Sequence, residues 1–165
     1  MQQPPLTAID CYKAFWTNAL NIHGRASRRE FWHPYWINFV LTTLLGIISA
    51  GTISSIFALA IIIPSFTLMA RRLHDTNHTM LLAVLNYFSG LVATTVAVIM
   101  VIMIVLLAAS TGSMLFGLIF IIGLVSVAVA FLLLLYTIFI LAKRGDEKPN
   151  NYGDGGTYRL VQYTE

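Results

Sequence analysis

Residues 80–108 read MLLAVLNYFSGLVATTVAVIMVIMIVLLA, and residues 114–141 read MLFGLIFIIGLVSVAVAFLLLLYTIFIL. Neither stretch contains an Asp, Glu, Lys or Arg residue. Uncharged, mostly apolar runs of about 18 residues or more are typical of transmembrane helices. Both stretches exceed the roughly 20 residues that a bilayer requires, so we expect these two helices to tilt or to project into the interface.

A second region without Asp, Glu, Lys or Arg lies nearer the N-terminus, at residues 31–70. It is too long for one crossing and suits two, about 31–48 and 53–70, joined by a short external turn at Ser49–Ser55. Ser27 and Glu30 have the spacing of a capping box just before the first of these spans. Pro34 falls in about the first turn, where proline is best tolerated. The sequence therefore predicts an all-α membrane protein with four transmembrane helices.

The composition supports the membrane assignment. The chain has 165 residues, of which 58% are hydrophobic and 10% charged, against about 25% charged in ordinary soluble domains. A soluble domain of this size cannot bury so much apolar surface, whereas a membrane protein exposes it to lipid. The formal charge of +3 does not indicate nucleic-acid binding, because the basic residues lie at the predicted membrane edges, where they meet anionic headgroups.

The positions of the basic residues predict the orientation. Every Lys and Arg lies outside the four spans and an even number of crossings from the next basic cluster. Cytoplasmic loops hold the excess of Lys and Arg, so both termini are expected in the cytoplasm, with residues 49–55 and 110–113 outside. The Lys and Arg residues on which this prediction rests are Lys13, Arg25, Arg28, Arg29, Arg71, Arg72, Lys143, Arg144, Lys148 and Arg159.

Three segments are expected along the chain. Residues 1–24 contain an amphipathic helix at 7–23, which either lies in the headgroup layer or docks on other cytoplasmic parts of the protein. Thr7 is its expected N-cap and Gly24 its expected C-terminal cap. Residues 25–142 form the transmembrane domain. Residues 143–165 are polar and rich in Gly and Asn, which predicts a cytoplasmic loop.

Three polar clusters flank the spans: Gly24–Trp32, Ala70–Asp75 and Asn150–Asp154. Guanidinium groups suit phosphate or carboxylate, which suggests an anion or lipid-headgroup site. Alternatively, the arginines anchor helix ends, and Arg71 pairs with Asp75 four residues later on one helix. The anion-binding candidates are Arg25, Arg28, Arg29, Arg71 and Arg72. We call the three clusters together the cytoplasmic rim, and its other polar candidates are Glu30, His74, Asp75, Asn151 and Tyr152.

The first two clusters flank a predicted helical hairpin, whose ends return to one side of the membrane. We therefore expect the clusters to meet, with Asp75 or Glu30 paired to an arginine of the other cluster. His74 and His78 have a spacing that can share a metal, but no further ligand is evident, so neither a metal nor a cofactor is expected. His74 beside Asp75 is a candidate acid–base pair, although no motif marks a nucleophile.

Three functions remain open at this point. The first is a non-catalytic protein that binds anionic lipid or a protein partner through the cytoplasmic rim. The second is a component of a small-solute transporter or channel, acting as a homo-oligomer, since the spans hold only mildly polar residues such as Asn86, Thr94 and Thr95. The third is an enzyme acting on lipid headgroups through His74 and Asp75.

The rim clusters resemble those of the DUF805 family of small bacterial inner-membrane proteins. The resemblance rests on Gly24–Trp32 (GRASRREFW), Arg71–Asp75 (RRLHD) and Asn151–Gly153 (NYG), and it covers about residues 12–155. It implies a four-helix membrane domain, in agreement with the predicted spans. Family members commonly follow the His-Asp pair with a Ser-Gly-Trp-Trp-like stretch, where this chain has Thr76–Leu82 without tryptophan. The family name records an unknown function, so the resemblance implies no reaction.

Overall fold

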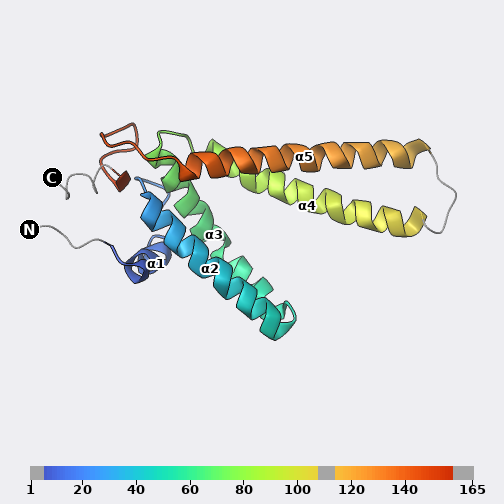
Figure 1. Ribbon diagram of the computed structural model, residues 1–165, viewed down its shortest axis with the longest axis horizontal. Helices are drawn as coiled ribbons and strands as arrows, with labels where there is room; N and C mark the ends of the chain where they lie inside the picture. The colour runs from blue at the N-terminus through green and yellow to red at the C-terminus, as the bar shows by residue number, and fades with distance from the viewer. Residues whose placement is uncertain (1–5, 108–113, 158–165) are drawn as a thin grey trace, which may run out of the picture. The chain divides into compact units, whose positions relative to one another are not determined.

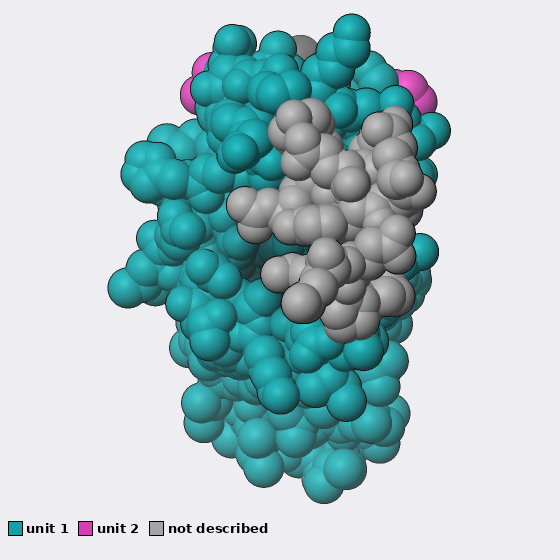
Figure 2. Space-filling view, turned by 90° about the vertical axis from the view of Figure 1, so that its left-hand side faces the viewer, with its two compact units in different colours: residues 1–80, 140–165 teal, residues 81–139 magenta. Residues whose placement is uncertain are grey.

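A computed structural model describes residues 6–107 and 114–157 of the chain (Figure 1). Within them the chain is all helical, as predicted, with α1 at Ala8–Thr17, α2 at Arg28–Ser49, α3 at Thr52–Asp75, α4 at Leu81–Leu107 and α5 at Met114–Ala142. The chain divides into two compact units, Met1–Met80 with Ile140–Glu165 and Leu81–Phe139, which Figure 2 colours teal and magenta. The first unit joins the N-terminal helices to the segment that begins at the end of α5.

Three helices in the described ranges are long and apolar enough to cross a membrane. They are Thr52–Asp75, Leu81–Ile104 and Phe120–Ala142, with mean hydropathies of 2.1, 2.2 and 2.8. The predicted first span corresponds to α2, which has 22 residues but is less apolar because it contains His33, Pro34 and Asn38. The boundaries predicted for the last two spans agree closely with α4 and α5, whereas the predicted turn at 110–113 lies outside the described residues.

Helix α2 begins at the predicted capping box. The Glu30 carboxylate accepts a hydrogen bond from the Ser27 amide at 2.7 Å, and the Ser27 hydroxyl accepts one from the Glu30 amide at 3.4 Å. Pro34 is the seventh residue of the helix, so it lies in the second turn rather than the first. The helix tolerates it there because the missing donor affects one intrahelical bond near the N-terminus.

A tight turn joins α2 to α3, which pack side by side (Figure 1). Ala50 and Gly51 both have left-handed backbone conformations, with φ of 48° and 94°. The turn is shorter than the predicted Ser49–Ser55 because Thr52 already begins α3. At its other end, α3 continues to Asp75, beyond the predicted limit at Ala70, so the second polar cluster lies on the last helical turns and not in a loop.

Helix α1 is shorter than predicted. Thr7 caps it as expected, in a capping box with Asp10. The helix ends at Thr17, and Asn18, at the C-cap, donates to the Ala14 carbonyl from both its amide at 3.1 Å and its side chain at 3.0 Å. Gly24, with φ of 82°, is therefore not the helix cap but the end of a linker, Asn18–Gly24. One face of α1 packs on α2, and its Tyr12 hydroxyl donates to Asn38 Oδ1 at 3.2 Å.

The second unit consists of most of α4 and α5. Between them, Asn86 Nδ2 donates to Thr137 Oγ1 at 3.2 Å, and Thr137 is buried. Gly123 of α5 faces Met100 of α4, and a Cβ at this position would meet the methionine sulfur. Most apolar side chains of both helices are exposed, including Leu91, Phe131 and Phe139. Such surfaces are expected of helices whose solvent is lipid.

Candidate functional site

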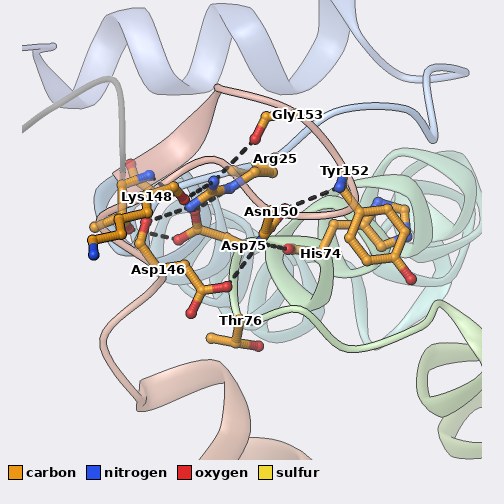
Figure 3. A network of polar contacts seen from close by, with 12 residues as sticks. Arg25, His74, Asp75, Thr76, Asp146, Lys148, Asn150, Tyr152 and Gly153 are labelled. Carbon is orange, nitrogen blue, oxygen red and sulfur yellow. Dashed lines mark hydrogen bonds and ion pairs between the residues drawn. The ribbon is translucent and has the colours of Figure 1, made fainter. Parts of the chain in front are cut away.

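The carboxylate of Asp75 lies at the centre of a polar network at the end of α3 (Figure 3). Its Oδ1 lies 3.0 Å from Nη2 of Arg25, and its Oδ2 lies 2.5 Å from Nη1 of Arg72. All three side chains have no solvent-accessible surface. We call these three residues the Arg–Asp cluster. The prediction that Asp75 pairs with an arginine of the other polar cluster is confirmed by its contact with Arg25.

The predicted pairing of Arg71 with Asp75 is wrong, because Arg72 forms the ion pair with Asp75 on this helix. Arg72 and Asp75 are three residues apart and point to the same side of the last turn of α3. The segment after α5 covers this side of α3. Arg71 instead contacts the residues before α2, because its backbone carbonyl accepts a hydrogen bond from the Ala26 amide at 2.9 Å. Burial thus favours the pair whose remaining hydrogen bonds can be satisfied inside the protein.

The segment after α5 wraps around Arg25. The Arg25 guanidinium donates to the carbonyls of Lys148 at 2.9 Å, Gly153 at 3.1 Å and Asp146 at 2.5 Å. Asn150 completes the contact by donating to the His74 carbonyl and to the Asp146 carboxylate, both at 2.9 Å. The described part of the predicted loop, residues 143–157, is therefore a folded element, in which backbone carbonyls accept the donors of one buried arginine.

Arg72 plays the corresponding role at the end of α5. Its Nε donates to the Leu141 carbonyl at 3.0 Å, and its Nη2 donates to the Lys143 carbonyl. The last carbonyls of a helix have no partner within the helix, and a cationic side chain satisfies them well. The charge of Arg72 also lies favourably at the negative end of the helix dipole. One arginine of α3 thereby fixes the C-terminus of a helix that ends about seventy residues later.

Two glycines allow the segment after α5 to approach Asp75. A Cβ on Gly145 would overlap the Asp75 carboxylate and lie 2.5 Å from the Thr157 hydroxyl. A Cβ on Gly156 would also overlap that carboxylate, and Gly156 has a left-handed φ of 61°. Thr157 adds hydrogen bonds to both carboxylate oxygens, from its amide at 2.9 Å and from its hydroxyl at 2.6 Å. Both oxygens of Asp75 are fully occupied in this way.

His74 is turned away from Asp75. Its ring stacks on the ring of Tyr152, with centroids 3.8 Å apart and planes within 3°, and its Nδ1 lies 3.1 Å from the Gly24 carbonyl. Asp75 therefore does not orient His74 as an acid–base pair would require. In the described part of the chain, no group of three or more His, Cys, Asp or Glu side chains is arranged to hold a metal ion.

The remaining basic residues differ in their exposure. Those at the start of α2 and just after α5 are exposed to solvent, and we call them the basic surface: Arg28, Arg29, Lys143 and Arg144. Arg144 forms a solvent-exposed ion pair with Glu147 at 2.5 Å. Asn151 is exposed, and Glu30 is half-buried in the capping box.

Arg71 belongs neither to the Arg–Asp cluster nor to the basic surface. It is half-buried, and its Nε and Nη2 are buried without a hydrogen-bond partner among the described residues. Its donors contrast with those of Arg25 and Arg72, which are satisfied by Asp75 and by backbone carbonyls. Buried donors without a partner are rare in native proteins.

Comparison with known proteins agrees with the pattern of the polar clusters. The family described as "Protein of unknown function (DUF805)" matches residues 19–154, which is most of the chain. The chain belongs to the DUF805 family. It is also 27% identical over 81 residues to "Inner membrane protein YhaH" of Escherichia coli, strains K12 and O157:H7, covering 43% of this chain and 67% of the relative. No solved structure matches it.

The DUF805 match begins after α1 and ends at Asp154. It therefore includes all members of the Arg–Asp cluster and the carbonyls that surround Arg25, and it excludes Thr157. The structure brings together Arg25, Arg72, Asp75, His74 and Tyr152 from the three predicted clusters. It leaves the predicted candidates Arg28, Arg29 and Asn151 at the surface.

Three further residues that contact Asp75 or allow close approach to it were not among the predicted candidates: Gly145, Gly156 and Thr157. A glycine three residues after the end of a helix, as at Gly145, is a usable signal for close approach of the backbone. Thr157 gave no signal, because a single threonine in a polar segment has no distinctive spacing. The backbone carbonyls that bind Arg25 and Arg72 cannot be recognised from side-chain identity at all.

Proposed function

We propose that this DUF805 protein is a four-span protein of the bacterial inner membrane, with α2 to α5 as its spans and both termini in the cytoplasm, and that it binds anionic phospholipid without catalysing a reaction. The similarity to an inner-membrane protein and the three membrane-capable helices support the location. The one-sided distribution of Lys and Arg supports the orientation.

The observation that carries the binding proposal is the division of the arginines. Arg25 and Arg72 are buried, and their donors are used to hold helix ends together. The charges of the basic surface are not needed for this and remain exposed on the same compact unit. Basic residues near the cytoplasmic leaflet each contribute on the order of 1 kcal/mol to attraction by anionic lipids, an effect that salt screens.

The test compares lipid selection by three forms of the protein reconstituted in nanodiscs from mixed phosphatidylglycerol and phosphatidylcholine. The forms are the native chain, a variant with all four basic-surface residues changed to Gln, and a matched variant with Arg28→Lys and Arg29→Lys. Enrichment of phosphatidylglycerol in the native and Lys forms, falling with added salt and lost in the Gln form, is expected. Equal enrichment in the Gln form would refute the role of the basic surface.

A further inference from the structure

One arginine at the end of α3 has a set of hydrogen-bond donors that the protein leaves unused. Nε and Nη2 of Arg71 are both buried, and no residue in the described ranges 6–107 and 114–157 forms a hydrogen bond with them. These two atoms form one edge of the guanidinium plane, the same edge by which Arg25 contacts Asp75. Such an edge presents two parallel N–H groups that match two oxygens of a phosphate or carboxylate. The unused donors of Arg71 thus have the geometry of a bidentate anion receptor.

The nearby carboxylate does not fill this receptor. Glu30 belongs to the polar cluster whose Ala26 amide donates to the Arg71 carbonyl at 2.9 Å. Its carboxylate is bound instead to the Ser27 amide at 2.7 Å in the capping box of α2. No ion pair joins Glu30 to Arg71 in the described ranges, where the ion pairs are Arg25–Asp75, Arg72–Asp75 and Arg144–Glu147. Arg71 therefore keeps an unmatched positive charge beside its unused donors.

The linker Asn18–Gly24 covers the face of α3 that carries Arg71. Four residues before Arg71, the Thr67 hydroxyl donates to the Ala19 carbonyl at 3.0 Å. Three residues after it, His74 Nδ1 lies 3.1 Å from the Gly24 carbonyl. Residues three and four apart lie on one face of a helix, so the linker is attached to α3 on both sides of Arg71. An anion reaches the guanidinium edge by displacing part of this linker or by drawing the half-exposed side chain outward.

The surroundings of Arg71 point to a lipid as the source of the anion. Helix α3 is one of the membrane-capable helices, and its exposed Ile62 and Ile63 lie about 12 Å or more along the axis from Arg71 at ~1.5 Å per residue. Leu20, directly after the residue that Thr67 binds, is 81% exposed. Exposed apolar side chains of the linker and of α3 are thus available to contact acyl chains of a lipid whose phosphate binds Arg71.

We propose that the Nε–Nη2 edge of Arg71 is a specific binding site for the phosphate oxygens of a phospholipid headgroup, beneath the linker Asn18–Gly24. This proposal deepens the proposed function, since it adds one defined lipid site to the general attraction by the basic surface. The two differ in chemistry. The basic surface requires only charge, whereas the Arg71 site requires the planar donor pair that a lysine lacks.

The experiment uses the purified full chain in lipid-depleted detergent, titrated with short-chain phosphatidylglycerol or with inorganic phosphate. The variants are Arg71→Lys, Arg71→Met and the surface control Lys13→Arg, at an exposed residue outside both proposed binding sites. Without lipid, Arg71→Met should unfold at a temperature equal to or above that of the native chain, because it removes buried donors that have no partner. Phosphatidylglycerol should raise the unfolding temperature of the native and Lys13→Arg forms, as a ligand of the folded state does.

In Arg71→Lys and Arg71→Met this lipid-induced shift should be lost, or should require roughly tenfold more lipid. Three results would overturn the proposal: the same shift in all forms, equal stabilisation of the native chain by inorganic phosphate, or destabilisation by Arg71→Met in lipid-depleted detergent. The basic surface is judged separately in nanodiscs by the four-residue Gln variant, which retains Arg71. If only the Arg71-dependent shift in unfolding temperature is not observed, the Arg71 site is wrong. If only the enrichment that depends on the basic surface is not observed, the role of the basic surface is wrong.

Discussion

The single negative charge of Asp75 forms ion pairs with two buried arginines, Arg25 and Arg72. A buried ion pair is tolerated when the remaining donors and acceptors are satisfied, and here backbone carbonyls receive the donors that Asp75 does not. The excess positive charge is thus spread over carbonyl dipoles from the segment after α5 and from the end of α5 itself. At the scale of the residue, the site is a closed electrostatic arrangement whose stability depends on one carboxylate.

Asp75→Asn should therefore lower the free energy of unfolding by about 3–5 kcal/mol, because it leaves two buried arginines without a counter-charge. The measurement is thermal or denaturant unfolding of the full chain in detergent. Asp154→Asn is the matched control, since Asp154 is exposed and its change should have an effect within about 0.5 kcal/mol. Similar stabilities of the two variants would contradict the assigned role of Asp75.

Gly145→Ala tests the close approach to Asp75 without removing any charge. The added methyl group overlaps the carboxylate, and overpacking of this kind costs about 1–3 kcal/mol. The same substitution at Gly90, where a Cβ meets nothing within 4 Å, should be neutral or stabilising by up to about 1 kcal/mol, since alanine favours a helix. Equal melting temperatures for the two variants would rule out steric exclusion at Gly145.

At the scale of the element, α1 has a docked face and an exposed face. Cys11 and Phe15 are buried, each with 1% exposure, whereas Ile9 is 67% exposed. The exposed apolar face supports the proposal that α1 lies in the headgroup layer, and the docked face shows that it also packs on α2. The two arrangements that the sequence left as alternatives are thus compatible in one helix.

The docked face can be tested through Cys11, the single cysteine of the chain. Burial raises the pKa of its thiol, and the nearby carboxylates of Glu30 and Asp10 raise it further. A raised pKa means less thiolate at neutral pH, so a maleimide should react slowly with the folded chain and rapidly after unfolding in SDS. The rate should increase with pH over a higher range than for an ordinary thiol.

Lys13→Cys in a Cys11→Ser background provides the exposed control on the same helix, because Lys13 faces solvent. Its thiol should react rapidly in the folded protein. If Cys11 reacted as fast as this control, α1 would not be docked on α2 as described.

The helices that the sequence predicts best are those with local signals. The capping box at Ser27 and the long uncharged runs placed α2, α4 and α5 within a few residues. The end of α1 at Thr17 was missed because the side-chain hydrogen bond of Asn18 at the C-cap has no periodic pattern. The role of Arg72 near the end of α3 was missed because it depends on contacts with residues at and after the end of α5. Those contacts join segments about seventy or more residues apart, which one sequence does not reveal.

At the scale of the whole molecule, the Arg–Asp cluster joins the start of α2 to the ends of α3 and α5. Arg25 lies just before α2, Arg72 lies in α3, and its partners Leu141 and Lys143 lie at the end of α5. Helix ends that meet in one cluster lie on one side of a membrane. This supports an even number of crossings between these ends, which the distribution of Lys and Arg also predicts.

The orientation can be measured by labelling single cysteines in intact cells, in the Cys11→Ser background. Ser55→Cys, near the turn between α2 and α3, should react with a membrane-impermeant maleimide added from outside. Lys148→Cys, in the segment that binds Arg25, should react only after the inner membrane is permeabilised. Labelling of Lys148→Cys in intact cells would refute the cytoplasmic location of this segment.

The bonds from Arg72 to the carbonyls of Leu141 and Lys143 also have a consequence for biogenesis. A ribosome releases the arginines and Asp75 of the cluster long before it releases the end of α5, because chains are synthesised from the N-terminus. Until then, their charges lack the carbonyls that satisfy them in the finished protein. A chain truncated before residue 141 lacks the carbonyl partners that Arg72 has in the complete protein. We therefore expect the packing of α2 on α3 to be less stable until α5 is complete.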